Sequence, residues 1–494
     1  MKSFTSLSVT MALLSGTTHA FWRMECHDRI ALARIDPLVD PGTVSQHSHA
    51  IHGGNAFSMD VTYEQLRASE CTSCLATDDK SAYWTPSMHF QYENGTTEVV
   101  RQVGGMLAYY LLFANSGEEI EAFPEGFRML AGDTRLRNFT GPVPDPEKSL
   151  WTAKDKTQLL LGQKAIGMNC LNYAKDPEPS MYRHFLPDKD YMDANCVNGI
   201  RAEIFFPSCW NGDPDSDNHK DHMAYPDLVN GGTCPEGFEK RVPSLFFETI
   251  WDTYAFKDAK GQFVFANGDP TGYGYHGDFI MGWNVDTLQS GIEQCTNESG
   301  QLKDCPVFEL QTEADCDKCK LSMPHVLSDD DCAGPADGLC GNVAIQYGPE
   351  YASALKPGNS EAPSAVPTPT TPVQAMPTLP YTTAKSAVTD QYGGGLSVAN
   401  VNGIASQASE INAQAAAPTD DAPAAPAPTQ PPAPEQPHGS IVSTTTYTSA
   451  GVVYEVAIEE VAVYVTVEAP APQKRHAHHM HHRRDREHGL LGRY

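Results

Sequence analysis

The sequence lacks any long apolar run once its first 20 residues are set aside. Residues 1–20, MKSFTSLSVTMALLSGTTHA, combine Lys2, a short apolar segment and a small-residue cleavage site. This pattern is typical of a secretory signal peptide, cleaved before Phe21. No later run reaches the roughly 18 apolar residues that a membrane span needs. We therefore expect a secreted protein without a membrane span, located in the extracellular space or in the cell wall.

Positive charge is also scarce. The chain carries 34 Lys and Arg against 62 Asp and Glu, a formal net charge of −28. Nucleic acids and anionic membrane surfaces are themselves negative and would repel such a chain. The composition therefore predicts no nucleic-acid partner, and it says nothing about the fold or the oligomeric state.

The common catalytic motifs are missing as well. The sequence contains no Gly-x-Ser-x-Gly elbow, no phosphate-binding P-loop, no dinucleotide-binding glycine pattern and no His-Glu-x-x-His. A catalytic site, if the protein has one, must use a less common arrangement of side chains. The absence of these motifs does not decide whether the protein is an enzyme.

What the sequence does contain is a globular region, residues 21–345, in which short apolar runs alternate with Gly, Pro, Asn and Asp. Runs such as RAEIFFPSCW and VPSLFFETIWDTY favour strands joined by long loops. Residues 99–113 fit a helix or a strand, and residues 149–171 and 289–295 suggest short helices. We predict a mainly β, sandwich-like fold with few short helices, stabilised by disulfides.

The C-terminal third differs in character. Residues 350–438 are rich in Pro, Ala, Ser and Thr, a composition that predicts a disordered linker. Residues 439–470 are β-prone, and residues 471–494 form a basic, His-rich tail. Lys474-Arg475 resembles a processing site, so this tail is expected either to be cleaved or to bind metal weakly.

Thirteen cysteines suit an oxidising compartment. The odd total leaves one thiol without a partner in the chain, and the six cysteines of the Cys-rich end, residues 295–340, are enough to pair among themselves. The spacings CTSC and CDKC also fit zinc or redox sites, but disulfides are favoured in a secreted chain. The disulfide candidates are Cys26, Cys71, Cys74, Cys170, Cys196, Cys209, Cys234, Cys295, Cys305, Cys316, Cys319, Cys332 and Cys340. Asn94, Asn138 and Asn297 lie in glycosylation motifs, so we expect a glycoprotein.

Two stretches share one spacing of metal-binding residue types. Asp217-x-His219-x-x-His222 repeats the spacing of His47-x-His49-x-x-His52. Residues two apart share a face of an extended segment, so two or three ligands converge. Imidazole and carboxylate suit zinc, copper or manganese. We predict His47, His49, His219 and His222 as ligands of one transition-metal ion; the alternative is hydrogen bonding within polar loops.

Carboxylates support a second interpretation. Glycoside hydrolysis needs two of them, and Asp213, Asp217, Glu248, Asp252, Asp269 and Asp278 are candidates. We predict three catalytic residues. Asp217 or Asp278 would orient a histidine or serve as general base, and His276 would act as acid/base. Trp210, Tyr225 and Trp283 lie near them in sequence and are predicted to stack on a polysaccharide. An ordinary β core with polar loop ends would have the same composition.

Four long motifs resemble a known family. FWRMECHDRIALARIDPLVDPGTVSQHSHAIHGGNAF, FPSCWNGDPDSDNHKDHMAYP, CPEGFEKRVPSLFFETIWDT and ANGDPTGYGYHGDFIMGW occur in the order found in fungal secreted proteins of domain of unknown function nineteen-ninety-six. The resemblance covers roughly residues 21–300, and the C-terminal β-prone segment resembles tails of fungal wall proteins. It implies an extracellular, wall-associated protein but no activity. It implies signature positions at Asp36, Asp40, His47, His49, Arg201, Asp217, His219, His222, Asp269, His276 and Asp278.

The sequence thus predicts a secreted protein that acts on or binds extracellular polysaccharide through a cleft lined by His and Asp, with a metal ion as its cofactor. Two alternatives remain: a non-catalytic structural or glycan-binding wall protein, and an extracellular metal-binding protein. The sequence leaves the substrate, the metal and the disulfide pairing open.

Overall fold

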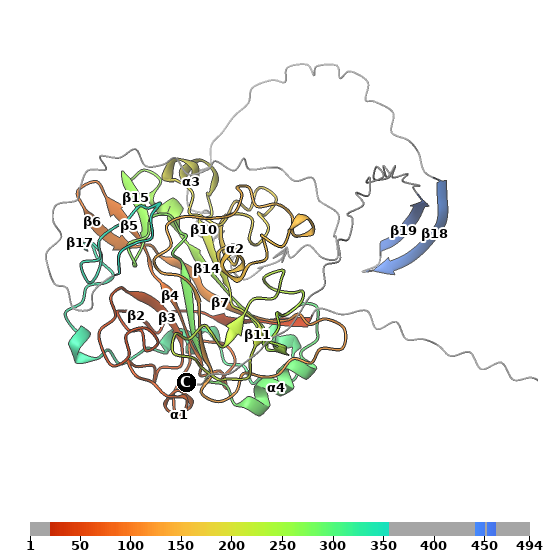
Figure 1. The fold of residues 1–494 in the computed structure, drawn as a ribbon, viewed down its shortest axis with the longest axis horizontal. Coiled ribbons are helices and arrows are strands. Elements are labelled where there is room, and N and C mark those ends of the chain that lie inside the picture. The colour runs from red at the N-terminus through yellow and green to blue at the C-terminus, as the bar shows by residue number, and fades with distance from the viewer. Residues whose placement is uncertain (1–19, 355–439, 450–451, 461–494) are drawn as a thin grey trace, which may run out of the picture. The chain divides into compact units, whose positions relative to one another are not determined.

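The computed structural model describes residues 20–354 and the two strands 440–449 and 452–460 (Figure 1). The predicted signal peptide up to residue 19, most of the linker and the whole His-rich tail lie outside the described residues. The first range contains the fold on which the candidate site is built. The two C-terminal strands, β18 (Ser440–Ser449) and β19 (Val452–Glu460), pair antiparallel with each other.

Two five-stranded sheets form the centre of the fold. Sheet A has the order β1 (Ala20–Cys26), β7 (Gln102–Leu112), β14 (Ser244–Trp251), β10 (Ile200–Phe205), β9 (Ile166–Cys170). Sheet B has the order β2 (Ala31–Ala33), β3 (His49–Gly53), β4 (Ala82–Pro86), β16 (His276–Ile280), β8 (Arg128–Gly132). All the neighbouring strands pair antiparallel.

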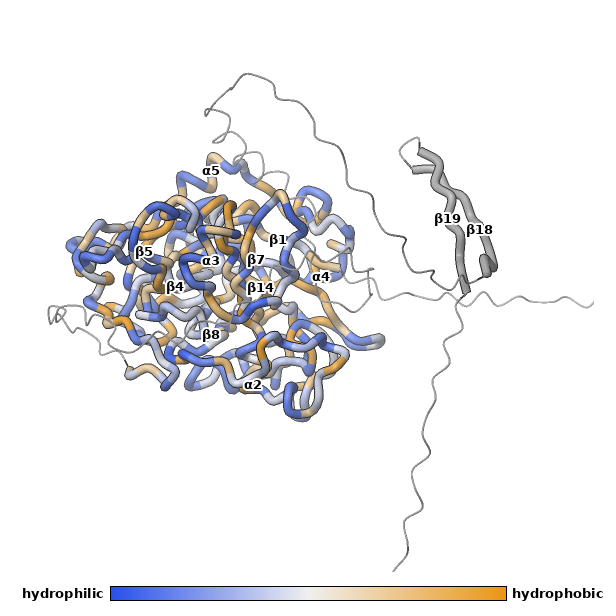
Figure 2. The backbone as a smooth tube through the Cα atoms, turned by 90° about the horizontal axis from the view of Figure 1, so that it is seen from above, coloured by the Kyte–Doolittle hydropathy of each residue, from blue (hydrophilic) through white to orange (hydrophobic). Residues whose placement is uncertain are grey.

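The sheets pack face to face. The Tyr83 ring of sheet B lies 5.6 Å from the Phe247 ring of sheet A, edge to face. Between the sheets, the largest cluster of buried apolar side chains includes Trp22, Tyr110 and Phe279. Figure 2 shows apolar segments along the strands in the middle of the fold and hydrophilic ones in the outer loops. The prediction of a mainly β, sandwich-like fold is confirmed.

Alternating side chains explain why these segments are strands. Along β1, burial alternates with period two, so Trp22 and Met24 point into the core while Arg23 and Glu25 do not. The segment that fitted either a helix or a strand is β7, which pairs with β1 on one side and β14 on the other. In that central position both faces are covered, which explains its continuous apolar run.

Smaller elements surround the sandwich. A four-stranded sheet has the order β15 (Gly261–Phe265), β5 (Met88–Tyr92), β6 (Thr96–Val99), β17 (Ala336–Asp337), and a three-stranded one β12 (Met223–Ala224), β11 (Cys209–Trp210), β13 (Lys240–Arg241). The helices are α1 (Tyr63–Arg67), α2 (Gln158–Lys164), α3 (Lys189–Asn195), α4 (Val285–Gln294) and α5 (Glu313–Lys318), with 3₁₀ turns η1 (Lys148–Leu150), η2 (Thr253–Phe256), η3 (Leu302–Asp304) and η4 (His325–Leu327). In the described part of the chain, no helix has the length and apolarity needed to cross a membrane.

Six disulfides connect these parts, and they correct one expectation. The pairs are Cys26–Cys74, Cys71–Cys319, Cys170–Cys196, Cys209–Cys234, Cys295–Cys305 and Cys332–Cys340. The Cys-rich end does not pair only with itself, because Cys319 reaches back to Cys71. Neither CTSC nor CDKC closes on itself. The unpaired thiol is Cys316, which is buried.

A chain of polar groups crosses the core of the sandwich. The Tyr83 hydroxyl lies 2.6 Å from Asp79 Oδ2 and 2.7 Å from the Tyr110 hydroxyl, which accepts a hydrogen bond from Trp283 Nε1. Asp79 is fully buried, and burial raises its pKa to about 6, although hydrogen bonds from Tyr83 and Ser81 oppose the shift. The core therefore favours the neutral form of this carboxyl group more than water does, and the group loses its proton near pH 6.

We predict that Asp79→Asn removes a pH dependence of stability. Because the folded-state pKa exceeds the unfolded value of 3.8, protonation of Asp79 stabilises the fold below about pH 4, and this contribution is lost as the pH rises through about 6. The shift corresponds to about 3 kcal/mol. Asparagine imitates the neutral form, so the wild type should lose about that much relative to the variant between pH 4 and pH 7.5 in urea unfolding.

Asp217→Asn is the matched control, because Asp217 is exposed. Its stability should follow that of the wild type across the same pH range. A difference between wild type and Asp79→Asn that stays constant with pH would contradict the prediction.

Candidate metal centre

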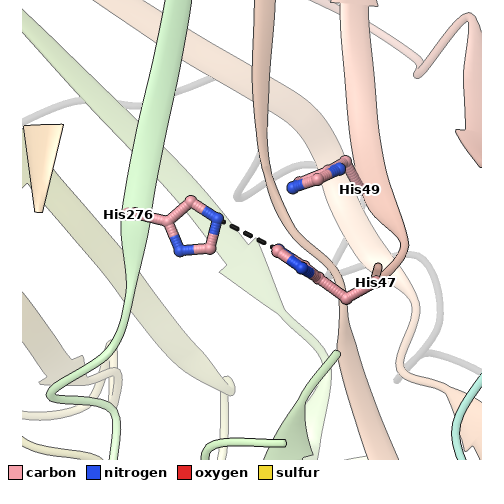
Figure 3. A group of neighbouring side chains, drawn as sticks. All are labelled: His47, His49 and His276. Atoms are coloured by element: carbon pink, nitrogen blue, oxygen red, sulfur yellow. Dashed lines mark hydrogen bonds between the residues drawn. The ribbon is translucent and has the colours of Figure 1, made fainter. Parts of the chain in front are cut away.

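Three histidines converge at one end of sheet B (Figure 3). His49 is the first residue of β3, His276 is the first residue of β16, and His47 lies two residues before His49. Each ring offers one nitrogen, and these three atoms lie within 4.8 Å of one another. We call this group the histidine triad.

Local structure explains the convergence. His47 lies in a bend two residues before β3, and its ring centroid lies 4.3 Å from that of His49. Strand β4 lies between β3 and β16, and Pro86 of β4 pairs with His49. The rings of His49 and His276 approach each other across β4, with centroids 5.8 Å apart.

The separations fit the coordination of one ion. His47 Nε2 lies 3.1 Å from His276 Nε2, and the ring centroids of His47 and His49 lie 4.3 Å apart. Two nitrogens bound to one tetrahedral zinc at about 2.0–2.1 Å would be roughly 3.3 Å apart. The observed distance also allows a hydrogen bond between the two rings, with one Nε2 protonated.

The hydrogen bonds of His276 determine which nitrogen is free. Its Nδ1 lies 3.1 Å from the Gly274 carbonyl oxygen, so Nδ1 carries the hydrogen and donates it. In a neutral ring this leaves the lone pair on Nε2, the atom that faces His47. A hydrogen bond of this kind orients the imidazole for a metal and increases its basicity as a ligand.

The surroundings keep all three rings neutral. Burial lowers the pKa of His276 to about 4 and the pKa values of His47 and His49 well below 6.5. Neighbouring rings lower the pKa values of His47 and His49 further, while the backbone of Ile35 opposes part of the shift at His49. Neutral imidazole is the form that binds metals.

Asp278 lies beside the triad on the same face of β16. Its Oδ2 is 4.0 Å from His276 Nε2, and neither carboxyl oxygen has a hydrogen-bond partner in the described structure. Burial, and next the charge of Asp36, raise its pKa well above 3.8, while Lys220 lowers it. A buried carboxyl group without a partner is costly to ionise unless a cation lies nearby.

Several buried polar atoms of the centre thus have no partner. Neither ring nitrogen of His49 makes a hydrogen bond of acceptable geometry, and the same holds for His47 Nδ1 and both oxygens of Asp278. Each unpaired buried group costs about 1–3 kcal/mol. A neutral imidazole carries one lone pair and one N–H, so the lone pairs at the centre left without a partner are one on His49 and those of Asp278. Native structures rarely leave such buried groups together, and a cation would supply the missing partner.

Two further aspartates hold the loops that carry the histidines. Asp36 Oδ1 accepts hydrogen bonds from the backbone of Leu38 and Val39, both 3.0 Å. Asp269 accepts hydrogen bonds from Thr271 and from the backbone of Gly274, immediately before His276. Both side chains are occupied within their turns, which indicates a positioning role.

A small pocket adjoins the centre. It has a volume of about 160 Å³, and His47 forms part of its wall. The other lining residues are Val39, Asp40, Gln46, Thr134, Arg135, Arg137, Asn267, Gln346, Ala352, Ser353 and Ala354. His47 is therefore shared between the triad and a space that a small ligand can enter.

The structure does not bring the residues 217–222 into the triad. His219 Nδ1 lies 2.6 Å from Asp215 and its Nε2 lies 3.0 Å from the Leu38 carbonyl oxygen, so both ring nitrogens are engaged. His222 Nδ1 lies 3.0 Å from Ser216 Oγ. Asp217 is exposed. This loop braces the 36–40 loop instead, and its Lys220 donates to the Gly132 carbonyl oxygen at 2.6 Å.

The predicted stacking residues are not available to a polysaccharide. Trp210, Tyr225 and Trp283 are buried, at 5%, 8% and 0% exposure, and Trp283 packs in the main core. This corrects the prediction, because proximity to carboxylates in sequence does not show which side of a strand an aromatic ring occupies. The asparagines of the glycosylation motifs, Asn94, Asn138 and Asn297, are all exposed.

Sequence analysis named Glu248 and Arg201 separately but did not predict that they belong to one charged cluster. On sheet A, Glu203 of β10 pairs directly with Glu248 of β14, and Arg201 Nε lies 2.7 Å from Glu203 Oε1. Tyr109 donates to Glu248 at 3.2 Å, and burial raises the pKa of Glu248. The alternation Arg201-x-Glu203 was the available signal. All four side chains are buried.

The fold and the centre define a disulfide-linked β-sandwich with a buried histidine triad on one sheet. The sequence profile of a domain of unknown function, DUF1996, matches residues 36–283, just over half of the chain. The chain belongs to this family, and the match contains the whole triad and Asp278. No curated protein and no solved structure matches the chain.

We predict that Gly132→Ala disturbs the triad through its backbone. Gly132 pairs with His276 and has a φ of +85°, and an added Cβ would lie 2.5 Å from the Tyr275 carbonyl oxygen and 2.9 Å from His276 Cα. Strain at positive φ alone costs about 1–2 kcal/mol, and the clash with β16 should add at least roughly 2 kcal/mol in urea unfolding.

Gly126→Ala separates the two effects. Gly126 has a similar φ of +77°, but nothing lies within 4 Å of an added Cβ. It should show only the cost of strain. Equal losses of stability in the two variants would show that β16 tolerates the added atom.

Proposed function

We propose that this protein is a secreted metalloprotein directed at extracellular polysaccharide, with one transition-metal ion held by His47, His49 and His276. The observation that supports the metal is the set of three buried imidazoles whose nitrogens lie within 4.8 Å of one another, beside the two unpartnered oxygens of Asp278. The polysaccharide rests on more indirect support: the acidic charge, the disulfides and the exposed glycosylation motifs suit an extracellular role.

The ligand atoms available restrict which metal ion the centre can bind. Three neutral imidazoles with a nearby carboxylate suit zinc, copper or manganese better than calcium or magnesium, which prefer oxygen ligands. Three protein ligands are also the number found in catalytic zinc sites, where the fourth position is open. Asp278 would either complete the coordination after a small movement or act as a base near the ion.

Electrostatics favours the same assignment. The three rings remain neutral at pH 7 and so keep their lone pairs, whereas Asp278 is destabilised as an anion by burial. A divalent cation would reverse this effect, since its charge favours the ionised carboxylate. Metal and carboxylate therefore stabilise each other.

A second candidate is a non-catalytic wall protein in which the ion is structural. Its support is burial: His49 is 0%, His276 1% and His47 6% exposed. A structural site is closed to substrate, whereas a catalytic site must be reached. Turnover of a polysaccharide that stops when the metal is removed would favour the enzyme, and retention of the polysaccharide without product would favour the wall protein.

The test is metal content by mass spectrometry on the full chain after incubation with zinc, copper or manganese, in wild type and His49→Ala. We expect the wild type to hold one equivalent more than the variant. Taking this difference cancels the contribution of the His-rich tail, which both proteins share. A difference close to zero for all three metals would reject the proposal.

Two controls sharpen the result. His219→Ala/His222→Ala should keep the ion, although the sequence pattern predicted its loss, because both side chains are hydrogen-bonded outside the triad. His325→Ala removes an exposed histidine elsewhere in the fold and should keep the ion, which shows that the loss in His49→Ala is specific to the triad. The metal should also stabilise the wild type by about 2.7 kcal/mol at 100 times its dissociation constant, and should leave His49→Ala unchanged.

A further inference from the structure

The pocket beside His47 has the composition of a site for a neutral, hydroxyl-rich ligand. Its polar residues carry both signs of charge, Asp40 against Arg135 and Arg137, together with the amides of Gln46, Asn267 and Gln346. Gln46 donates to Asp40, and Gln346 is hydrogen-bonded to Ser353. The groups left for a ligand are therefore chiefly those of Arg135 and the carbon surface of Val39 and Ala352. Hydroxyl groups both donate and accept, and a sugar ring adds apolar C–H faces.

Two residues that line the pocket each have one buried polar atom without a partner. Asn267 donates from its amide nitrogen to the carbonyl oxygens of Thr134 and Gly274, but its Oδ1 accepts nothing, although the residue is only 2% exposed. His47 Nδ1 is also unpaired. The lone-pair or N–H directions of the two imidazole nitrogens diverge. His47 Nε2 faces His276, so His47 Nδ1 points away from the triad.

Arg135 supplies further donors. Its Nε donates to the Ala352 carbonyl oxygen at 2.6 Å, and its guanidinium group lies 4.3 Å from the centre of the Tyr351 ring. Within residues 20–354, no carboxylate lies within ion-pair distance of Arg135. Its terminal nitrogens therefore have hydrogen-bonding capacity left for a ligand.

The size of the pocket limits the ligand. A cavity of roughly 150 Å³ holds one benzene molecule, and this pocket has about 160 Å³. A pyranose unit has about twice as many heavy atoms as benzene, so the pocket would take part of one unit, with the rest of the ring and of a longer glycan outside.

We propose that this pocket binds one neutral pyranose unit of a polysaccharide, and that the segment 346–354 is a specificity-determining wall. The first part rests on the proposed function. Ligand binding is linked to the triad through His47, which lines the pocket while its Nε2 faces His276.

The segment 346–354 is held firmly in place. The Ala352 amide donates to the Arg135 carbonyl oxygen at 2.8 Å, the Ser353 amide donates to Gln346 Oε1 at 2.8 Å, and the Tyr351 hydroxyl donates to Asp133 at 2.5 Å. It lies outside residues 36–283, the part that matches the family. One part of the pocket is therefore formed by residues within the family match, and another part by a segment outside it. Substrate preference can differ between members of the family through that second part.

The test is isothermal titration of the metal-loaded full chain with five hexasaccharides: laminarihexaose, cellohexaose, mannohexaose, chitohexaose and the anionic hexagalacturonate. We expect one or more of the neutral four to bind, and Arg135→Ala to weaken binding at least tenfold. Arg135→Lys should recover part of the affinity, since it keeps a charged donor. Arg101→Ala, which removes an exposed arginine elsewhere, should bind like the wild type.

The outcomes separate this inference from the proposed function. Metal content is measured on the same samples, and Arg135→Ala should hold as much metal as the wild type. Normal metal content with no binding of any hexasaccharide at millimolar concentration overturns the pocket assignment alone. Preference for hexagalacturonate overturns the neutral class, and unchanged affinity in Arg135→Ala overturns the role of Arg135. Loss of metal in the wild type overturns the proposed function instead.

Discussion

The close contact between β16 and sheet A determines which residues form the centre. At Gly277 an added Cβ would lie 3.0 Å from Ile204 Cγ2 and 2.9 Å from the Phe206 ring, so only a glycine allows the two sheets to approach this closely. Because side chains alternate along a strand, Gly277 on the inner face places His276 and Asp278 together on the outer face. The same feature, Gly277 on the inner face of β16, thus determines both how closely the sheets pack and on which face His276 and Asp278 lie.

The outer face is then closed by loops. Turns built on Asp36 and Asp269 carry His47 and precede His276, and the 215–222 loop braces the first of these turns through His219. His219 itself has a positive φ of 56°, a conformation that histidine adopts more readily than most residues. The histidine triad therefore depends on three loops that are far apart in the sequence and on two strands separated by a third.

Part of the arrangement of the centre could be predicted from the sequence, because residues two apart lie on the same face of a strand. The spacing His276-x-Asp278 places two groups on one face of β16, as expected, whereas His47 lies in a bend just before β3, which His49 begins. The structure does not bring His219 and His222 to the triad, because their segment turns and both nitrogens of His219 and the Nδ1 of His222 lie within hydrogen-bonding distance of other groups. The pairing of β3 and β16 with β4 is a long-range contact that no local pattern encodes. Burial was also invisible: Trp283 next to a carboxylate looks the same in sequence whether it faces solvent or the core.

The disulfide between Cys71 and Cys319 has a consequence for the durability of the protein. It joins residues 248 positions apart, and His276 and Asp278 lie between them while His47 and His49 precede Cys71. A protease that cuts one exposed loop between those cysteines would produce two fragments that remain covalently joined. Under oxidising conditions the nicked molecule would keep its mass, and the strands on both sides of the cut would stay paired. An extracellular protein exposed to proteases could in this way survive its first cleavages as a functional, two-chain molecule.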